Sequence, residues 1–185
     1  MGTRRIALFV LAAMLAAPGH ADTTDKPDKV EKPDPLAPLD RFIGDWQGTA
    51  TGQAGAGTVT RRYARVMGGR FIQEANTSTY PAQEKNPKGE VHEHSGMFSF
   101  DKQRKALMLR QFHIEGFVNT YRQASEPGAE KLVFESEAFE NFSNAWKARE
   151  TYEFLSNDQF VETFELAPPG KPWTVYSRTE LRRVR

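Results

Sequence analysis

Three of the four histidines in this chain lie in one short stretch, at His92, His94 and His113. His92 and His94 are two positions apart, so they share a face if the segment is an extended strand. His113 falls on the next predicted strand, where its hairpin partner is expected between Ser95 and Met97. Two or three neighbouring imidazoles could form a transition-metal or heme site. In the simpler alternative, His92 and His94 only mark the exposed start of a strand beside a polar loop.

The strand that carries His113 is predicted to point one polar group inward, whichever face is buried. His113 alternates with Leu107 and Leu109, whereas Arg110 lies on the opposite face. Ligand-binding cavities place a few such polar groups among apolar ones. Arg110 and His113 are therefore candidate ligand-binding residues. The alternative for Arg110 is a buried ion pair with a glutamate.

Three further residues are candidates for ligand contacts. Glu150 lies on the same predicted strand face as Tyr152, so an inward carboxylate is expected there. Trp46 and Tyr121 are large aromatic residues that would line a cavity. The sequence holds no nucleophile elbow, phosphate-binding loop or metalloprotease motif. It therefore gives no support for an enzyme, and we assign no catalytic residue and no metal ligand.

Alternating hydrophobicity and turn signals predict about ten short strands without a crossover helix. A short helical turn at 39–43 precedes them. Consecutive strands joined by tight turns favour an all-β, antiparallel up-and-down barrel, because closure removes exposed strand edges. A barrel of this size has room for one small ligand. The predicted strands cover residues 44–51, 59–67, 70–79, 92–100, 106–114, 117–121, 131–138, 146–155, 159–166 and 173–184.

The composition narrows the class of partner. The formal net charge is +1, and it becomes about −1 without Arg4 and Arg5. Basic residues are dispersed among acidic ones, which argues against nucleic acid as the main partner. The chain has no cysteine, which excludes disulfides and thiolate chemistry. The fold must depend on its core alone.

The first 38 residues differ in character from the rest. Residues 1–21 have the charged start, short apolar run and small-residue end of a secretory signal peptide, with cleavage expected after Ala21. The apolar run is too short to span a membrane. Residues 22–38 are charged and proline-rich, as in a disordered linker. We expect an exported protein, periplasmic or secreted, whose barrel occupies residues 39–185.

Two short motifs resemble known families. The segment from Gly44 to Gly52 resembles the Gly-x-Trp-x-Gly-x-Gly strand that opens nitrobindin-like barrels, and His92 to Phe98 resembles their His-x-x-Ser-Gly-aromatic strand. The chain is also similar to an uncharacterised bacterial lipocalin-like family. The resemblance implies a ten-stranded, calycin-type barrel with an internal cavity. Nitrobindins bind heme through a histidine near the C-terminus, and here no histidine follows His113, so heme would need His92 or His113.

Three functions follow from these observations. The first is a non-enzymatic barrel that binds a small, largely apolar molecule, with Arg110, His113 and Glu150 orienting its polar end. The second, implied by the resemblance, is a heme protein acting on nitric oxide or peroxynitrite. The third is a structural envelope protein whose barrel is filled by its own side chains. The oligomeric state stays open.

Overall fold

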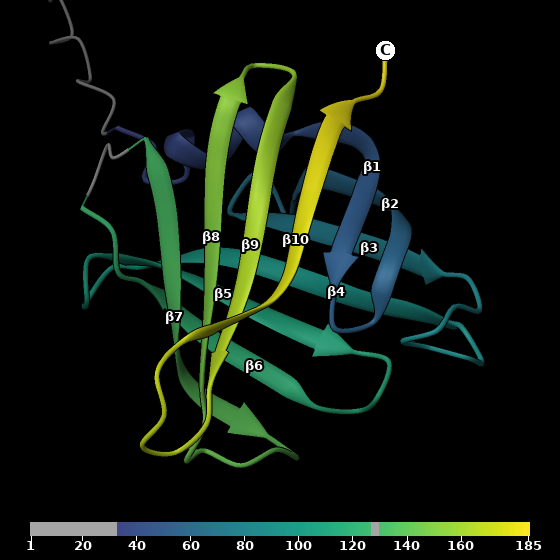
Figure 1. The fold of residues 1–185 in the computed structure, drawn as a ribbon. Helices are drawn as coiled ribbons and strands as arrows, with labels where there is room; N and C mark the ends of the chain where they lie inside the picture. The colour runs from purple at the N-terminus through teal and green to yellow at the C-terminus, as the bar shows by residue number, and fades with distance from the viewer. Residues whose placement is uncertain (1–32, 127–129) are drawn as a thin grey trace, which may run out of the picture. The chain divides into compact units, whose positions relative to one another are not determined.

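The computed structural model describes residues 33–126 and 130–185, which form a closed barrel of ten antiparallel strands (Figure 1). The predicted fold class is confirmed. The strands are β1 (Gly44–Gly52), β2 (Gly55–Val66), β3 (Phe71–Tyr80), β4 (Glu90–Asp101), β5 (Ala106–His113), β6 (Val118–Gln123), β7 (Lys131–Glu140), β8 (Lys147–Ser156), β9 (Gln159–Ala167) and β10 (Thr174–Arg183).

The topology is a simple meander. Each strand pairs with its neighbours in sequence, and β1 closes the barrel by pairing with β10. All strand connections are local, so no long crossover is needed. The hairpin between β2 and β3 turns at Gly68 and Gly69, whose φ angles of 68° and 79° favour glycine.

Side chains alternate between the barrel interior and solvent along each strand. On β3, Ile72, Glu74 and Asn76 are buried while the residues between them are exposed. The same period-two pattern on β8 buries Ala148 and Glu150. The interior therefore contains charged groups as well as apolar ones.

A short 3-10 helix, η1 (Ala37–Phe42), closes one end of the barrel. The Phe42 ring is fully buried and packs against the rings of Tyr63, Tyr152 and Phe160, with centroid distances of 5.0, 5.2 and 5.3 Å. Trp46 donates a 2.6 Å hydrogen bond from Nε1 to the Phe42 carbonyl oxygen. Aromatic packing thus fills this end, and the predicted helical turn is confirmed.

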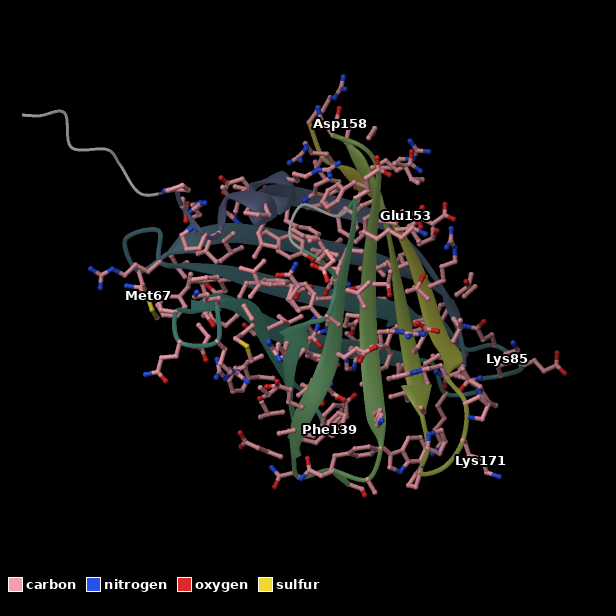
Figure 2. All side chains as sticks on the ribbon, turned by 90° about the vertical axis from the view of Figure 1, so that its left-hand side faces the viewer. Met67, Lys85, Phe139, Glu153, Asp158 and Lys171 are labelled. Carbon is pink, nitrogen blue, oxygen red and sulfur yellow. The ribbon has the colours of Figure 1, made fainter. Side chains whose placement is uncertain are left out.

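The opposite end of the barrel carries the β7–β8 and β9–β10 connections. Figure 2 shows Phe139 and Lys171 towards this end, and Asp158 in the β8–β9 turn at the other. In the part of the chain that the structure describes, no helix has the length and apolar character needed to cross a membrane.

The predicted signal peptide, residues 1–21, lies outside the described residues, as does most of the predicted linker, residues 22–38. The folded barrel starts slightly before Leu39. Leu36 is buried in the core, and Ala37 begins η1.

Candidate functional site

A cavity of about 470 Å³ occupies the open half of the barrel. This volume is within the usual range for small-molecule sites. The cavity has two zones, an aromatic rim and a polar floor. The rim includes Tyr80, Phe117, Phe139, Phe142, Trp146, Phe164 and Tyr176, and the floor includes Arg61, Asn76, Gln111, Asn119, Glu150, Glu162 and Thr179.

Part of the cavity floor is a buried ion network centred on Arg61. The Arg61 guanidinium donates to both carboxylate oxygens of Glu162, at 2.8 and 2.7 Å. Its Nε donates to Asn76 Oδ1 at 2.9 Å and lies 3.2 Å from Glu74 Oε1. Tyr63 donates its hydroxyl to the same Glu74 oxygen at 3.2 Å. One guanidinium therefore faces two carboxylates.

At Glu74, the charges and hydrogen bonds of this network outweigh the effect of burial on the carboxyl pKa. Burial by itself would raise the pKa of this carboxyl, but the Arg61 charge, together with His94 and the Tyr63 hydroxyl, lowers it below its ordinary value. Glu74 fits there because its cross-strand partner is Gly96. A Cβ at position 96 would lie 2.4 Å from Glu74 Oε2.

Three other floor residues have an oxygen without a partner. Gln111 Oε1, Asn119 Oδ1 and Glu150 Oε2 are buried and accept no hydrogen bond from any of residues 33–126 and 130–185. All three side chains line the cavity, and they come from β5, β6 and β8. Buried polar atoms normally have partners, so this arrangement points to a polar occupant of the cavity.

The environment of Glu150 favours the neutral form of its carboxyl. Burial raises the pKa of its carboxyl well above the ordinary value, and the nearby negative charge of Glu162 adds to the effect, while Arg61 opposes it. A protonated carboxylic acid can donate one hydrogen bond and accept others. In this neutral form Glu150 offers both a donor and an acceptor to the cavity.

The three histidines meet at the wall of the cavity. His94 pairs directly with His113 across β4 and β5, and His92 lies two residues along the same face. The ring centroids are 5.3 to 5.7 Å apart. The predicted register placed His113 opposite Ser95 to Met97, and that was wrong. The β4–β5 hairpin pairs Asp101 with Ala106, which brings the imidazoles together.

Each imidazole also has a polar neighbour outside the group of three histidines. His92 Nδ1 lies 2.8 Å from Glu115 Oε1, and His94 Nε2 lies 3.3 Å from Glu74 Oε1. Asn119 Nδ2 is 3.2 Å from His113 Nε2. Burial, together with the neighbouring His94 and His92, lowers the pKa of His113 to about 3. His113 is therefore uncharged at neutral pH.

The structure brings some, but not all, of the predicted site residues to the cavity. His92, His113 and Glu150 line it. Trp46 and Tyr121 are fully buried in the core and are not among the lining residues.

Arg110 lies on the outside of the barrel, exposed to solvent. Neighbouring residues of a strand point to opposite faces, so the inward position of Gln111 forces Arg110 outward. No buried glutamate pairs with Arg110 among the described residues, and we leave it out of the proposed site.

Sequence reasoning missed Arg61, Glu74, Glu162, Gln111 and Asn119. A signal for Arg61 was present, because it alternates with Val59 and Tyr63 on one face of a predicted strand. A charged residue in an otherwise apolar alternating face indicates an interior network.

A second depression, of about 770 Å³, lies on the outer surface of β1 to β5. Outward-facing side chains such as Gln47, Thr60 and Thr77 line much of it. It is larger than the interior cavity but open to solvent. The unpartnered oxygens of Gln111, Asn119 and Glu150 belong to residues that line the interior cavity, which is therefore the stronger candidate for a ligand site.

Fold and site together define a ten-stranded, antiparallel closed barrel with one end plugged and a cavity with a polar floor. Among solved structures, the crystal structure of Rv2717c from M. tuberculosis is similar, with a TM-score of 0.62 and 15% sequence identity. The match covers 84% of this chain and 100% of that one. Comparison with protein-family models and with curated protein sequences finds no match. The similarity shows the fold and nothing more specific.

Proposed function

We propose that this protein is a binding protein that holds one small molecule in the barrel cavity. The observation that carries the proposal is the set of unpartnered oxygens on Gln111, Asn119 and Glu150. A ligand head group that donates hydrogen bonds would satisfy them and recover the cost of leaving them unpaired, about 1–3 kcal/mol for each group.

The charge of the floor favours a neutral or cationic head group. The single guanidinium of Arg61 is already paired with Glu162 and lies beside Glu74. Burial raises the pKa of the Glu150 carboxyl and so favours its neutral form, and Glu115 adds a further carboxylate near the rim. An anionic group such as a carboxylate would meet excess negative charge in a low-dielectric site. Amines, amides and alcohols fit this floor better than fatty acids do.

The rim favours a flat or apolar body on the same ligand. Trp146, Phe142 and Phe139 form a continuous aromatic contact series, with centroid distances of 5.8 Å and 5.6 Å. Aromatic side chains of this kind bury large apolar surfaces and stack on planar groups. The proposed ligand is thus amphipathic, with its polar end at the floor.

The cavity counts against a barrel filled by its own side chains. Phe42 and its neighbours fill the end closed by η1, whereas the cavity remains in the rest of the barrel. A volume of 470 Å³ exceeds that of a few water molecules, each of which takes about 30 Å³ in the liquid.

Two matched fluorescent probes test the proposal. N-phenyl-1-naphthylamine is a neutral aromatic amine, and 8-anilino-1-naphthalenesulfonate has the same rings with an added sulfonate. We expect saturable binding of the neutral probe to one site, and binding of the anionic probe weaker by about tenfold or more, which corresponds to about 1.4 kcal/mol. Equal binding of both probes contradicts the charge argument, and no binding of either contradicts the proposed site.

Native mass spectrometry of protein purified without detergent addresses the natural ligand. A mass increase that corresponds to a small amine, amide or alcohol supports the proposal. A mass increase equal to heme, with a Soret band that His113→Ala abolishes, supports the heme alternative instead. A bare chain that also fails to bind the neutral probe would leave a purely structural role.

We further propose that the protein is exported, on the basis of the sequence of residues 1–21 alone. Cleavage after Ala21 would leave Asp22 as the first residue of the mature protein. N-terminal sequencing of the protein from the cell envelope or medium tests this. An intact N-terminus in that fraction would contradict cleavage.

A further inference from the structure

We propose that His92, His94 and His113 form a binding site for one divalent transition-metal ion whose open coordination position faces the barrel cavity. Imidazole nitrogens suit Zn²⁺, Co²⁺, Ni²⁺ and Cu²⁺. The proposal goes beyond ligand binding and does not depend on it, because the three side chains are placed by the β4–β5 hairpin itself.

The spacing of the nitrogens fits a metal ion. One nitrogen from each histidine can be chosen so that all three lie within 4.8 Å of one another. His92 Nε2 and His113 Nδ1 are 3.4 Å apart. Two imidazole nitrogens bound to one tetrahedral ion at about 2.0–2.1 Å are separated by about 3.3–3.4 Å, so this pair needs almost no movement.

His94 provides an independent observation. Its side chain is only 9% exposed, and neither ring nitrogen forms a hydrogen bond with any residue that the structure describes. A buried imidazole without hydrogen bonds is costly, because burial removes water from both nitrogens. The Glu74 carboxylate lies 3.3 Å from Nε2 but is poorly aligned. A metal ion bound at Nδ1 would give the ring a partner.

Groups behind the histidines are suited to orient metal ligands. Metal-bound histidines usually donate their second ring N–H to a carboxylate or carbonyl, which fixes the ring. Here Glu115 lies 2.8 Å from His92 Nδ1, and Glu74, 3.3 Å from His94 Nε2, would need a small realignment to accept from it. These contacts leave His92 Nε2 and His94 Nδ1 for the ion.

Asn119 completes the set for His113. Its amide nitrogen faces His113 Nε2 at 3.2 Å and Tyr121 Oη at 2.8 Å, while its oxygen has no partner within the described ranges. Binding of a metal to His113 Nδ1 places the proton on Nε2. Rotating the Asn119 amide by half a turn then lets Oδ1 accept from His113 Nε2 and from the Tyr121 hydroxyl. The rotation gives Oδ1 two donors and moves Nδ2 to the position that Oδ1 leaves, so with the metal bound the unpartnered oxygens that support ligand binding are those of Gln111 and Glu150.

Three protein ligands leave at least one coordination position free. Closed structural zinc sites use four protein ligands, whereas sites with three keep a position for water or another ligand. All three histidines line the cavity, so that position is accessible from it. An amine or hydroxyl on a cavity ligand could occupy it.

The test uses the full-length protein without a histidine tag, dialysed against a chelator and titrated with Co²⁺ and Zn²⁺ near pH 7.5. Visible absorption reports the Co²⁺ ligand field, and calorimetry gives the Zn²⁺ stoichiometry. The chain has no cysteine and only one other histidine, His20, so His20→Ala is a matched control. Circular dichroism in chelator checks that each variant is folded.

We expect one ion per chain, unchanged in His20→Ala and weakened about 100-fold or more in each of His92→Ala, His94→Ala and His113→Ala. Glu115→Gln should weaken binding by about 10- to 100-fold, as expected for loss of an orienting carboxylate. Should the folded wild type bind no ion more tightly than about 0.1 mM, or should any of the three alanine variants bind like the wild type, the site is refuted. Probe binding in chelator is measured separately, so failure here leaves the ligand proposal untouched.

Discussion

The guanidinium group of Arg61 on β2 holds the carboxylate of Glu162 on β9 at 2.8 and 2.7 Å, across the two intervening strands β1 and β10. Both side chains are almost fully buried. The pair is therefore a link between parts of the barrel wall that share no backbone hydrogen bonds. It also leaves the floor with carboxylates in excess of guanidinium groups.

Removing this guanidinium should be strongly destabilising. Arg61→Met leaves Glu162 and Glu74 buried without their cation, which typically costs about 3–5 kcal/mol. Urea denaturation measures the free energy of unfolding. Arg62→Met is the matched control, because the neighbouring Arg62 side chain is 71% exposed and its change should stay within about 0.5 kcal/mol.

A double variant tests the same pair when Arg61→Met alone fails to fold. Adding Glu162→Gln removes one of the two unpaired charges, so Arg61→Met/Glu162→Gln should be more stable than Arg61→Met. Equal stability of these two variants, or equal effects at Arg61 and Arg62, would show that the ion pair has no special role.

The buried acid Glu150 predicts that stability depends on pH. Its pKa in the folded protein is raised by burial, while in the unfolded chain it has an ordinary value near 4.5. Above the unfolded pKa, the folded state binds the extra proton, so stability falls as pH rises towards the folded pKa. The slope for one proton is at most about 1.4 kcal/mol per pH unit.

Glu150→Gln removes that contribution. We expect the variant to be more stable than the wild type at pH 7, with the difference vanishing below the unfolded pKa. Denaturation curves between pH 4 and pH 8 measure it. Glu153→Gln, on the solvent face of the same strand, is the control. A difference independent of pH would contradict a raised pKa for Glu150.

The barrel could be predicted because its signals are local. Alternation defines each strand, and glycine, proline and asparagine define the turns, so all ten strands appear close to their predicted bounds. Leu36 lies in the predicted linker but is buried in the core. Local composition could not predict this, because the residues that Leu36 contacts are distant in the sequence.

The site could be predicted only in part, because neither the register between strands nor the face of each strand that points inward is set by local sequence. A shift of one residue in the β4–β5 hairpin decides whether His113 meets His94. The choice of buried face on β5 decides between His113 and Arg110. The Arg61–Glu162 pair joins residues 101 positions apart, which no local pattern reveals.

Gly96 is predicted to be intolerant of any side chain. A Cβ there would lie 2.4 Å from Glu74 Oε2, and the buried carboxylate cannot move without disturbing Arg61. Gly96→Ala should therefore cost about 1–3 kcal/mol, as for overpacking of a core. Thermal and urea unfolding measure it.

A double-mutant cycle identifies the cause. Glu74→Asp shortens the side chain and makes room, so the cost of Gly96→Ala should be smaller in the Glu74→Asp background, with a coupling of about 0.5 kcal/mol or more. Additive effects would mean that the destabilisation of Gly96→Ala has another origin than the Glu74 contact.

The aromatic rim predicts which surface residues matter for ligand binding. Trp146 lines the cavity, whereas Trp173 stacks under the Arg149 guanidinium at 4.5 Å and is not among the lining residues. Trp146→Ala should weaken binding of N-phenyl-1-naphthylamine by about tenfold to thirtyfold, because it removes apolar contact worth roughly 1.4–2 kcal/mol. Trp173→Ala is the matched control, and Arg110→Ala should bind the probe as the wild type does, since Arg110 points to solvent. Loss of probe binding in Arg110→Ala, or wild-type binding in Trp146→Ala, would place the ligand outside the barrel cavity.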